Sequence, residues 1–314
     1  MDRDVWTNLM AAIRRATGAV KSSVRAPKYS DRLIVAMYFW SVWHDRCLSW
    51  AADRDHYGAL FRPRKLPSVS QFTRRVKTAS VREILQRVHD DLAAVHVASP
   101  VSYLDGKALP VSPVSKDKEA TRGKVPGGFA KGYKLHAYVT EDQRIVAWSL
   151  MPLNTAEQSV AMELFAALRN PHGATRATLS PLSLADSNYD SADLHRAVAA
   201  GGGSLLTPLK GQGRIKNGRH HPVTLRQMGP ARREAVALWK GHPDLCQYVL
   251  DQRDDIERVF SALTCYGGGL GPLPAWVRTL PRVRRWVGAK ISLYHARLWA
   301  RKQRDEKQEK GVAA

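Results

Sequence analysis

The hydrophobic pattern of the chain changes near residue 100, and this change limits the fold more than any other feature of the sequence. Before it, apolar residues recur three and four positions apart, as between Leu33 and Trp40, which is helix spacing. After it, residues 133–139 alternate between apolar and other side chains, which is the two-residue period of a strand. We therefore predict a helical region over residues 1–98 and a strand-containing domain over residues 99–270.

Within the second region, alternation and turn residues predict a definite order of elements. The predicted strands are Val101–Asp105, Tyr133–Val139, Ile145–Met151, Leu182–Asp186 and Ser204–Thr207. The predicted helices begin at Thr155, Ser191 and Arg253. The stretch Gly106–Lys131 is predicted to be a flexible loop, and the stretch at about 210–247 a basic insertion. Three antiparallel strands followed by strand–helix alternation indicate an α+β fold, a mixed sheet with flanking helices.

The N-terminal region carries two helix-start patterns. Ser68 and Ser80 are each followed three residues later by Gln or Glu, which is a capping box. The first of these helices carries Arg74 and Arg75, and a short helix of this kind can enter the DNA major groove. The alternative is an ordinary helical bundle with a solvated basic face, and it stays open because helix-turn-helix spacing is weakly specific.

Residues 271–314 are predicted to form a basic helical C-terminal extension. Between Ala275 and Lys310 there are 11 Lys plus Arg against 3 acidic residues. Aromatic residues are interleaved with them, namely Trp276, Trp286, Tyr294 and Trp299. Such rings can stack on nucleic-acid bases, or they can pack on the core while the charges are solvated. The sequence leaves both possibilities open.

The charge balance indicates a polyanionic partner. The 314 residues include 49 Lys plus Arg and 28 Asp plus Glu, a formal net charge of +21. An excess of this size is costly in self-repulsion unless a polyanion neutralises it, and nucleic acid is the usual one. A basic ribosomal protein or a membrane-surface protein is the alternative.

Cysteine usage and hydropathy indicate a cytoplasmic protein. The three cysteines are far apart and form no C-x-x-C pair, so we expect reduced thiols and neither a disulfide framework nor a structural zinc site. Met1–Ala11 lacks the apolar run of a secretory signal, and Leu33–Trp43 is too short to span a bilayer.

Three acidic residues stand where acids are unexpected. Asp105 and Asp186 each follow an apolar strand, and Glu257 flanks the apolar stripe of its predicted helix. Each has an ordinary explanation as a turn residue or a surface ion pair. Together, in this strand–helix order and on so basic a chain, they instead predict a carboxylate site for two Mg²⁺ ions, with Mn²⁺ as a substitute. Two such ions can activate an attacking oxygen and stabilise a leaving oxygen in phosphodiester chemistry.

The motifs around these acids resemble those of bacterial insertion-sequence DDE transposases. They are Tyr103-Leu104-Asp105-Gly106, Lys131-Gly132-Tyr133-Lys134-Leu135-His136, Ala185-Asp186-Ser187-Asn188-Tyr189-Asp190 and Arg253-x-x-Ile256-Glu257-Arg258-x-Phe260. Asn154 followed by Glu157 also resembles the segment after the hairpin in that family. The similarity extends from about Val101 to Leu270. Many members have a Tyr and a Lys where this chain has Leu250 and Thr264, so the motifs assign no subgroup.

The resemblance implies an RNase H-like catalytic domain, with the first Asp on the first strand, the second at the fourth strand and the Glu on a late helix. It implies hydrolysis at the element's end, followed by attack of the freed 3′-hydroxyl on target DNA. The implied partners are terminal inverted repeats and target DNA, and pairing of two ends implies at least a homodimer. Candidate phosphate contacts are Lys107, Lys131, Lys134, Arg253 and Arg258, besides Arg74 and Arg75.

Some residues compete with this assignment. Asp190 is a rival to Asp186, and we prefer Asp186 because Asp190 stands where it can cap a helix. His136 is expected on the polar side of its strand, solvated or locally bonded, and His220-His221 lacks further spaced ligands for zinc. Two other functions stay open: a non-catalytic DNA-binding regulator derived from a transposase, and an RNase H-like nuclease or resolvase.

Overall fold

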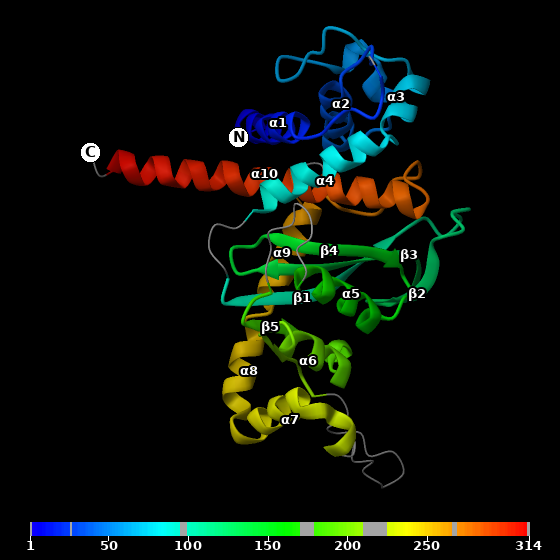
Figure 1. Cartoon of the computed structure of the whole chain (residues 1–314). Coiled ribbons are helices and arrows are strands. Elements are labelled where there is room, and N and C mark those ends of the chain that lie inside the picture. The colour runs from blue at the N-terminus through cyan, green and yellow to red at the C-terminus, as the bar shows by residue number, and fades with distance from the viewer. Residues whose placement is uncertain are drawn as a thin grey trace. The chain divides into compact units, whose positions relative to one another are not determined.

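The computed structural model describes residues 2–25, 27–94, 99–169, 179–209, 225–265 and 269–312. The chain forms two compact units (Figure 1). One comprises Met1–Ala94 and Ala262–Ala314, and the other comprises Val95–Ser261. The predicted C-terminal extension is therefore part of the N-terminal helical unit, since α10 (Leu280–Val312) packs against three of that unit's helices.

The first unit is helical, as the sequence predicts. Its other helices are α1 (Asp2–Gly18), α2 (Asp31–Trp43), α3 (Val69–Arg75) and α4 (Ala79–Ala93), with short 3-10 turns at Trp50–Ala52 and Arg54–His56. Helix α2 is apolar on every side and is buried along most of its length. Ser30 caps it and Ser68 forms the predicted capping box of α3. The predicted start of α4 was wrong: Thr78 precedes the helix, and Ser80 lies inside it with its hydroxyl 2.9 Å from that of Ser23.

Most aromatic residues of the C-terminal segment pack into this unit. Trp286 and Tyr294 are buried, and the Trp299 indole donates a hydrogen bond to the Leu92 carbonyl at 2.9 Å. Trp276 is 40% exposed. Of the two possibilities that the sequence left open, packing on the core accounts for the first three rings.

The second unit is built on a mixed sheet of six strands. These are β1 (Val101–Pro110), β2 (Thr121–Val125), β3 (Gly128–Thr140), β4 (Ile145–Pro152), β5 (Leu182–Ala185) and β6 (Ser204–Leu206). Their order is β2-β3-β1-β5-β6, with β4 also paired to β3. Strand β3 pairs antiparallel with both β1 and β4. Strand β5 pairs parallel with β1, and β6 pairs parallel with β5. This is the RNase H-like α+β arrangement, with β2 as an additional strand.

The prediction of a flexible loop over Gly106–Lys131 was wrong. Strand β1 continues through Gly106 to Pro110 because β3 supplies backbone partners along this stretch, from Ser102 opposite Thr140 to Pro110 opposite Gly132. Composition argued against a strand, but pairing with a neighbouring strand decided the outcome. Asp105 consequently lies within a long strand and does not end a short one.

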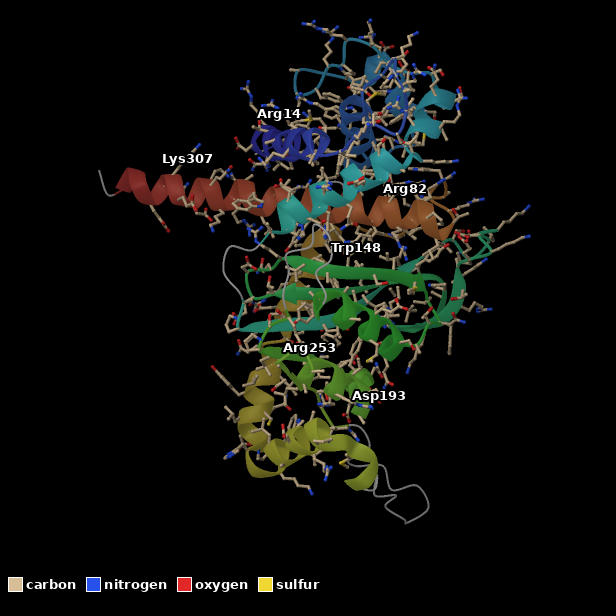
Figure 2. All side chains as sticks on the ribbon, in the orientation of Figure 1. Arg14, Arg82, Trp148, Asp193, Arg253 and Lys307 are labelled. Atoms are coloured by element: carbon tan, nitrogen blue, oxygen red, sulfur yellow. The ribbon has the colours of Figure 1, made fainter. Side chains whose placement is uncertain are left out.

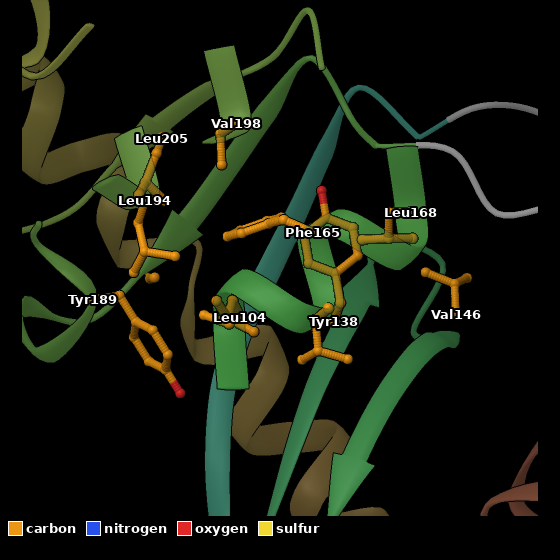
Figure 3. Packing of buried hydrophobic residues seen from close by; sticks show 12 residues of the cluster. Leu104, Tyr138, Val146, Phe165, Leu168, Tyr189, Leu194, Val198 and Leu205 are labelled. Atoms are coloured by element: carbon orange, nitrogen blue, oxygen red, sulfur yellow. The ribbon is translucent and has the colours of Figure 1, made fainter. Parts of the chain in front are cut away.

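Helices cover both faces of the sheet. Helices α5 (Glu157–Arg169) and α6 (Ala192–Ala199) pack on one face, where Phe165 meets the Tyr138 ring edge-on at 5.9 Å (Figure 3). Helix α9 (Asp254–Cys265) contacts the other face through alternate residues of β1. The Tyr103 hydroxyl lies 3.5 Å from Asp255, and the Lys107 ammonium lies 6.0 Å from the Phe260 ring. Since side chains alternate along a strand, Asp105 points to the α9 side.

The predicted basic insertion is largely helical where the structure describes it. Helices α7 (Leu225–Gly241) and α8 (Pro243–Asp251) follow β6, and α7 is kinked at Gly229, whose φ of 68° suits glycine. The predicted pair His220-His221 lies outside the described residues. Across the described ranges, no helix has both the length and the apolar character needed to cross a membrane.

Candidate active site

Asp105 lies on β1, and Asp186 directly follows β5, the parallel neighbour of β1. The register of β1 and β5 pairs Leu104 with Ala185, so the next residue on each chain is an aspartate. The Asp186 carboxylate is close enough for its charge to contribute to the raised pKa of Asp105. Asp186 follows the fifth strand, not the fourth, because β2 is an addition to the predicted order.

The Asp105 carboxylate is held between a backbone amide and a guanidinium. The Gly106 amide donates to Asp105 Oδ1 at 2.7 Å, and Arg253 Nη1 lies 3.5 Å from Oδ2. Arg253, named from the sequence as a candidate phosphate contact, is thus directed to Asp105. Burial raises the pKa of Asp105 to about 6, and the favourable contacts with Gly106 and Arg253 offset only part of that cost.

Asp186 is fixed by its own turn. Its Oδ1 accepts a hydrogen bond from the Asn188 amide at 2.8 Å, and its Oδ2 accepts one from the Asn188 side chain at 3.2 Å. This local bonding follows from a short 3-10 turn, Ser187–Tyr189, that begins directly after the aspartate. The carboxylate is therefore oriented by the segment that leaves β5.

Glu257 lies on α9, one helical turn after Arg253, and its side chain is exposed. The turn spacing places it on the same side of the helix as Arg253, which contacts Asp105. No contact between Glu257 and either aspartate is recorded. In the part of the chain that the structure describes, no three His, Cys, Asp or Glu side chains are gathered closely enough to hold a metal ion. The assignment of Glu257 as the third ligand stays a prediction.

A second group of polar side chains lies beside the two aspartates. The Tyr189 hydroxyl is 3.2 Å from His136 Nδ1, and Glu157 lies close enough for its charge to act on the phenol. Burial, together with the charges of Glu157, Asp105 and Asp186, raises the pKa of Tyr189 well above its usual value. The phenol thus stays protonated and has three carboxylates around it. The sequence had pointed to Glu157 only through a motif resemblance, and no local pattern marked Tyr189.

Lys134 balances the charge of Glu157. Its ammonium pairs with Glu157 Oε1, and both side chains are about one-fifth exposed. Gly106 leaves the space for this lysine, since a Cβ at Gly106 would collide with the Lys134 side chain. The other carboxylate oxygen of Glu157 is buried and has no hydrogen-bond partner in the described structure.

His136 is fully buried, contrary to the predicted polar, solvated position. Burial and the nearby Lys134 charge lower its pKa to about 4, so the imidazole is neutral at physiological pH. The sequence expectation of a local bond was correct, because Nδ1 meets Tyr189. The alternation of β3 predicted an outward side chain, but α5 and the Ser187–Tyr189 turn cover this face of the sheet.

Asp190, the rival to Asp186, is a structural residue. Its buried carboxylate accepts two hydrogen bonds from Arg232, at 2.8 and 2.7 Å, and lies 3.4 Å from His195 Nε2. Ser191, and not Asp190, caps α6. A carboxylate that is matched in this way has little capacity left for a ligand.

The predicted phosphate contacts differ in their availability. Arg74 is exposed on α3, and Arg258 is exposed while pairing with Asp255 at 2.7 Å. The Lys131 ammonium donates to the Ser115 carbonyl at 2.8 Å. Arg75 is only 12% exposed and pairs with Asp31 and the Tyr29 carbonyl, so it has a structural role instead of the predicted DNA contact.

The donor set at Asp105 and Asp186 fits a hard divalent cation. Two carboxylates on adjacent strands supply the oxygen ligands that Mg²⁺ prefers. One of them is buried with a raised pKa, so a bound cation would relieve an existing electrostatic cost.

Comparisons with known proteins give structural similarity and no sequence match. No protein-family model matches the sequence, and no curated protein matches it. The structure is similar to the piggyBac transposase in its cryo-EM synaptic complex with hairpin DNA, with a TM-score of 0.47 and 9% identity, over 97% of this chain and 73% of that chain. It is also similar to a chain in the cryo-EM structure of the simian T-cell lymphotropic virus intasome in complex with PP2A regulatory subunit B56 gamma. That match has a TM-score of 0.22 and 14% identity, over 67% of this chain and 64% of that chain.

Proposed function

We propose that this chain is a DNA transposase, a metal-dependent polynucleotidyl transferase of the insertion-sequence DDE type. Its catalytic carboxylates are Asp105, Asp186 and Glu257, its cofactor is Mg²⁺ or Mn²⁺, and its substrates are the terminal inverted repeats and the target DNA. It works as a homodimer or larger assembly in the bacterial cytoplasm, because two ends must be paired for transfer. The motif resemblance, and not an interface, is the source of these finer assignments.

The observation that carries the proposal is the side-by-side placement of Asp105 and Asp186. Two like charges are held together in a partly buried site with one nearby guanidinium, Arg253. Such an arrangement is unfavourable for stability and useful for holding cations. On a chain with a net charge of +21, the substrate that brings both phosphates and cations to this site is nucleic acid.

When bound, a pair of Mg²⁺ ions supplies activation of the attacking oxygen and charge stabilisation at the leaving oxygen. The chain's own residues fix the site around them. Arg253 and the Gly106 amide hold the Asp105 carboxylate, and Asn188 holds that of Asp186. Because the pKa of Asp105 is about 6, this carboxylate is mostly ionised at neutral pH.

His136 is neutral and Tyr189 is protonated, so neither adds charge near the aspartates. The Lys134 ammonium, held by Glu157 above Gly106, is the cation placed to contact a phosphate oxygen when DNA is bound. Arg253 lies 3.5 Å from Asp105 and partly balances the charge of this carboxylate.

The experiment is a strand-transfer assay with end-labelled DNA that carries the element's own terminal repeats and a supercoiled target. We expect Mg²⁺-dependent cleavage and joining by the wild-type protein. Asp105→Asn, Asp186→Asn and Glu257→Gln should each lose activity by at least about 10³-fold, while DNA binding is largely kept. Asp244→Asn, an exposed acid in the first turn of α8, is the control and should retain activity.

The same assay separates the two alternatives. A regulator derived from a transposase would bind DNA and neither cut nor join it. A nuclease or resolvase would cut without joining the freed 3′-hydroxyl to target DNA. Full activity in all three single variants would contradict the proposed site.

A further inference from the structure

The region predicted as a loop contains a two-stranded ribbon. Strands β2 and β3 are joined by the turn Pro126–Gly127, where Gly127 has a φ of 83° that a residue with a Cβ rarely adopts. The pairing of β1 with β3 ends at Gly132, opposite Pro110. The Val111 amide still donates to the Lys131 carbonyl at 2.9 Å, and residues 128–130 of β3 pair with β2 alone, so this part of the hairpin projects beyond the other strands of the sheet. Figure 1 shows β2 and the adjoining end of β3 at one end of the sheet.

One face of the ribbon carries three cations and one aromatic ring. The register places Arg122 opposite Lys131 and Lys124 opposite Phe129. Residues directly opposite on antiparallel strands point to the same side, so these four side chains share a face. Two like charges directly opposite one another are destabilising, and an anion that bridges them would remove that cost.

The cations of β2 are available for a ligand. Arg122 and Lys124 are exposed, and no ion pair or hydrogen bond of their side chains is recorded in the described structure. Phe129 is 73% exposed, although phenylalanine is normally buried. Exposed cations around an exposed ring match a partner that presents phosphates beside flat, apolar surface.

The opposite face of the ribbon fixes it to the sheet. Gly123 is buried there, and a Cβ at this position would lie 2.8 Å from the Leu153 carbonyl oxygen. The Asn154 amide donates to the Thr121 hydroxyl at 3.1 Å. The base of the ribbon is thus anchored by the segment that follows β4. A rigid base presents the other face to a ligand at little cost in entropy.

We propose that this ribbon is a DNA-binding arm. Arg122, Lys124 and Lys131 contact phosphates, and Phe129 packs against base edges in the major groove, which admits a two-stranded β-ribbon. The inference relies on the proposed function for the identity of the polyanion, and it assigns a binding surface outside the carboxylate site.

The sheet sets the position of the contact relative to the cut. Phe129 and Ala137 are on the same face of β3, and Ala137 is the partner of Asp105. Eight residues separate them, which is roughly 26 Å of strand. At roughly 3.4 Å per base pair, DNA that lies along β3 would meet Phe129 up to about eight base pairs from the cleaved phosphate.

The first test measures binding of the full chain to duplex DNA as a function of salt. Arg122→Gln/Lys124→Gln should reduce the slope of log affinity against log salt by about 2 and weaken binding roughly ten-fold near physiological salt. Phe129→Ala should weaken binding several-fold with the slope unchanged. The matched controls are Arg301→Gln/Lys307→Gln on α10 and Tyr248→Ala on α8, where Tyr248 is 67% exposed.

The second test locates the contact. A photo-crosslinking p-benzoylphenylalanine in place of Phe129 should label DNA up to about eight nucleotides from the cleaved phosphate. The same probe in place of Tyr248 should not label that stretch. Unchanged affinity and slope in both ribbon variants, or equal labelling from both probe positions, would overturn the proposal. Ribbon variants that bind DNA normally and lose binding to phosphatidylserine vesicles would identify a membrane-surface arm instead.

The two proposals fail in different ways. If the chain with the photo-crosslinker at position 129 labels DNA but the wild-type protein never cleaves DNA, the transposase assignment fails and the arm stands. If Asp105→Asn abolishes cleavage while the ribbon variants bind and cleave normally, the arm fails and the transposase assignment stands.

Discussion

Asp186 and Asp190 lie four residues apart after β5, and the surroundings of their carboxylates are opposite in character. Asp190 is fully buried and receives two hydrogen bonds from Arg232, with His195 close by. Asp186 remains partly exposed, next to Asp105, whose pKa is raised to about 6. The charge of Asp190 is balanced by Arg232 within the fold. The pair of Asp105 and Asp186 has one nearby guanidinium, that of Arg253, which lies 3.5 Å from Asp105. We infer that the fold uses Asp190 for its own stability and keeps Asp105 and Asp186 for a ligand.

The largest change in the free energy of unfolding should come from breaking the ion pair between Asp190 and Arg232. Arg232→Met leaves the Asp190 carboxylate buried without its cation, and we expect a loss of about 3–5 kcal/mol in the free energy of unfolding. Urea unfolding followed by circular dichroism measures this loss. The double variant Asp190→Leu/Arg232→Met should recover most of the stability, because removal of both charges leaves neither of them unpaired. Equal loss in the single and double variants would show that the pair is not the cause.

Removing a charge from the pair of Asp105 and Asp186 should instead increase stability. Asp105→Asn removes a buried charge from beside Asp186, so the metal-free protein should gain stability on the order of 1–3 kcal/mol at pH 7.5. Thermal unfolding in EDTA measures the gain. Asp193→Asn, which changes an exposed acid on α6, is the control and should have little effect. A destabilised Asp105→Asn protein would mean that this carboxylate contributes to the fold in the same way as Asp190.

The pH dependence sharpens the contrast further. The pKa of Asp105 rises from 3.8 to about 6 on folding, so the folded state binds more protons between these values. The wild-type protein should therefore lose stability relative to Asp105→Asn as the pH rises from about 4 to about 6, with no further divergence above that range. Unfolding curves of both proteins in EDTA, collected from pH 3.5 to 8, test the sign. A difference that grows towards low pH would contradict it.

Gly106→Ala should have the smallest effect on stability. The new methyl group displaces the flexible Lys134 side chain from Glu157, a partly exposed pair worth about 1 kcal/mol at most. Reduced freedom of the unfolded chain offsets part of this loss. The consequence should be seen in DNA cleavage, where the variant should show a higher KM if Lys134 contacts a phosphate. Lys134→Gln provides the matched comparison, and normal cleavage by both variants would remove this lysine from the site.

The sequence predicted the elements whose signals are local. Ser68 caps its helix as expected, and β1 and β5 contain the apolar runs that precede Asp105 and Asp186, although β1 continues past Asp105 and β5 ends before Asp186. It failed where distant partners decide the structure. The strand over residues 106–110 depends on β3, and the burial of His136 depends on α5 and the Ser187–Tyr189 turn.

Within the site, too, contacts between residues that are distant in the sequence could not be predicted. Nothing near Arg253 in the sequence indicates that it pairs with Asp105, 148 residues away, and nothing near Arg232 indicates Asp190. The grouping of Tyr189 with Glu157 likewise arises from the packing of α5 on the turn after β5. Side chains that meet only through the fold leave no periodic signal, since sequence spacing reports neighbours along one element.

The most direct measurement is the heat of Mn²⁺ or Mg²⁺ binding to the full chain at pH 7.5, compared among the wild type, Asp105→Asn and Asp186→Asn. We expect saturable binding by the wild-type protein and at least a ten-fold weaker affinity in each variant, with Asp244→Asn unchanged. If both aspartate variants bind the cation as tightly as the wild type, these two carboxylates do not form the metal site, and the proposed metal-dependent catalysis at Asp105 and Asp186 is contradicted.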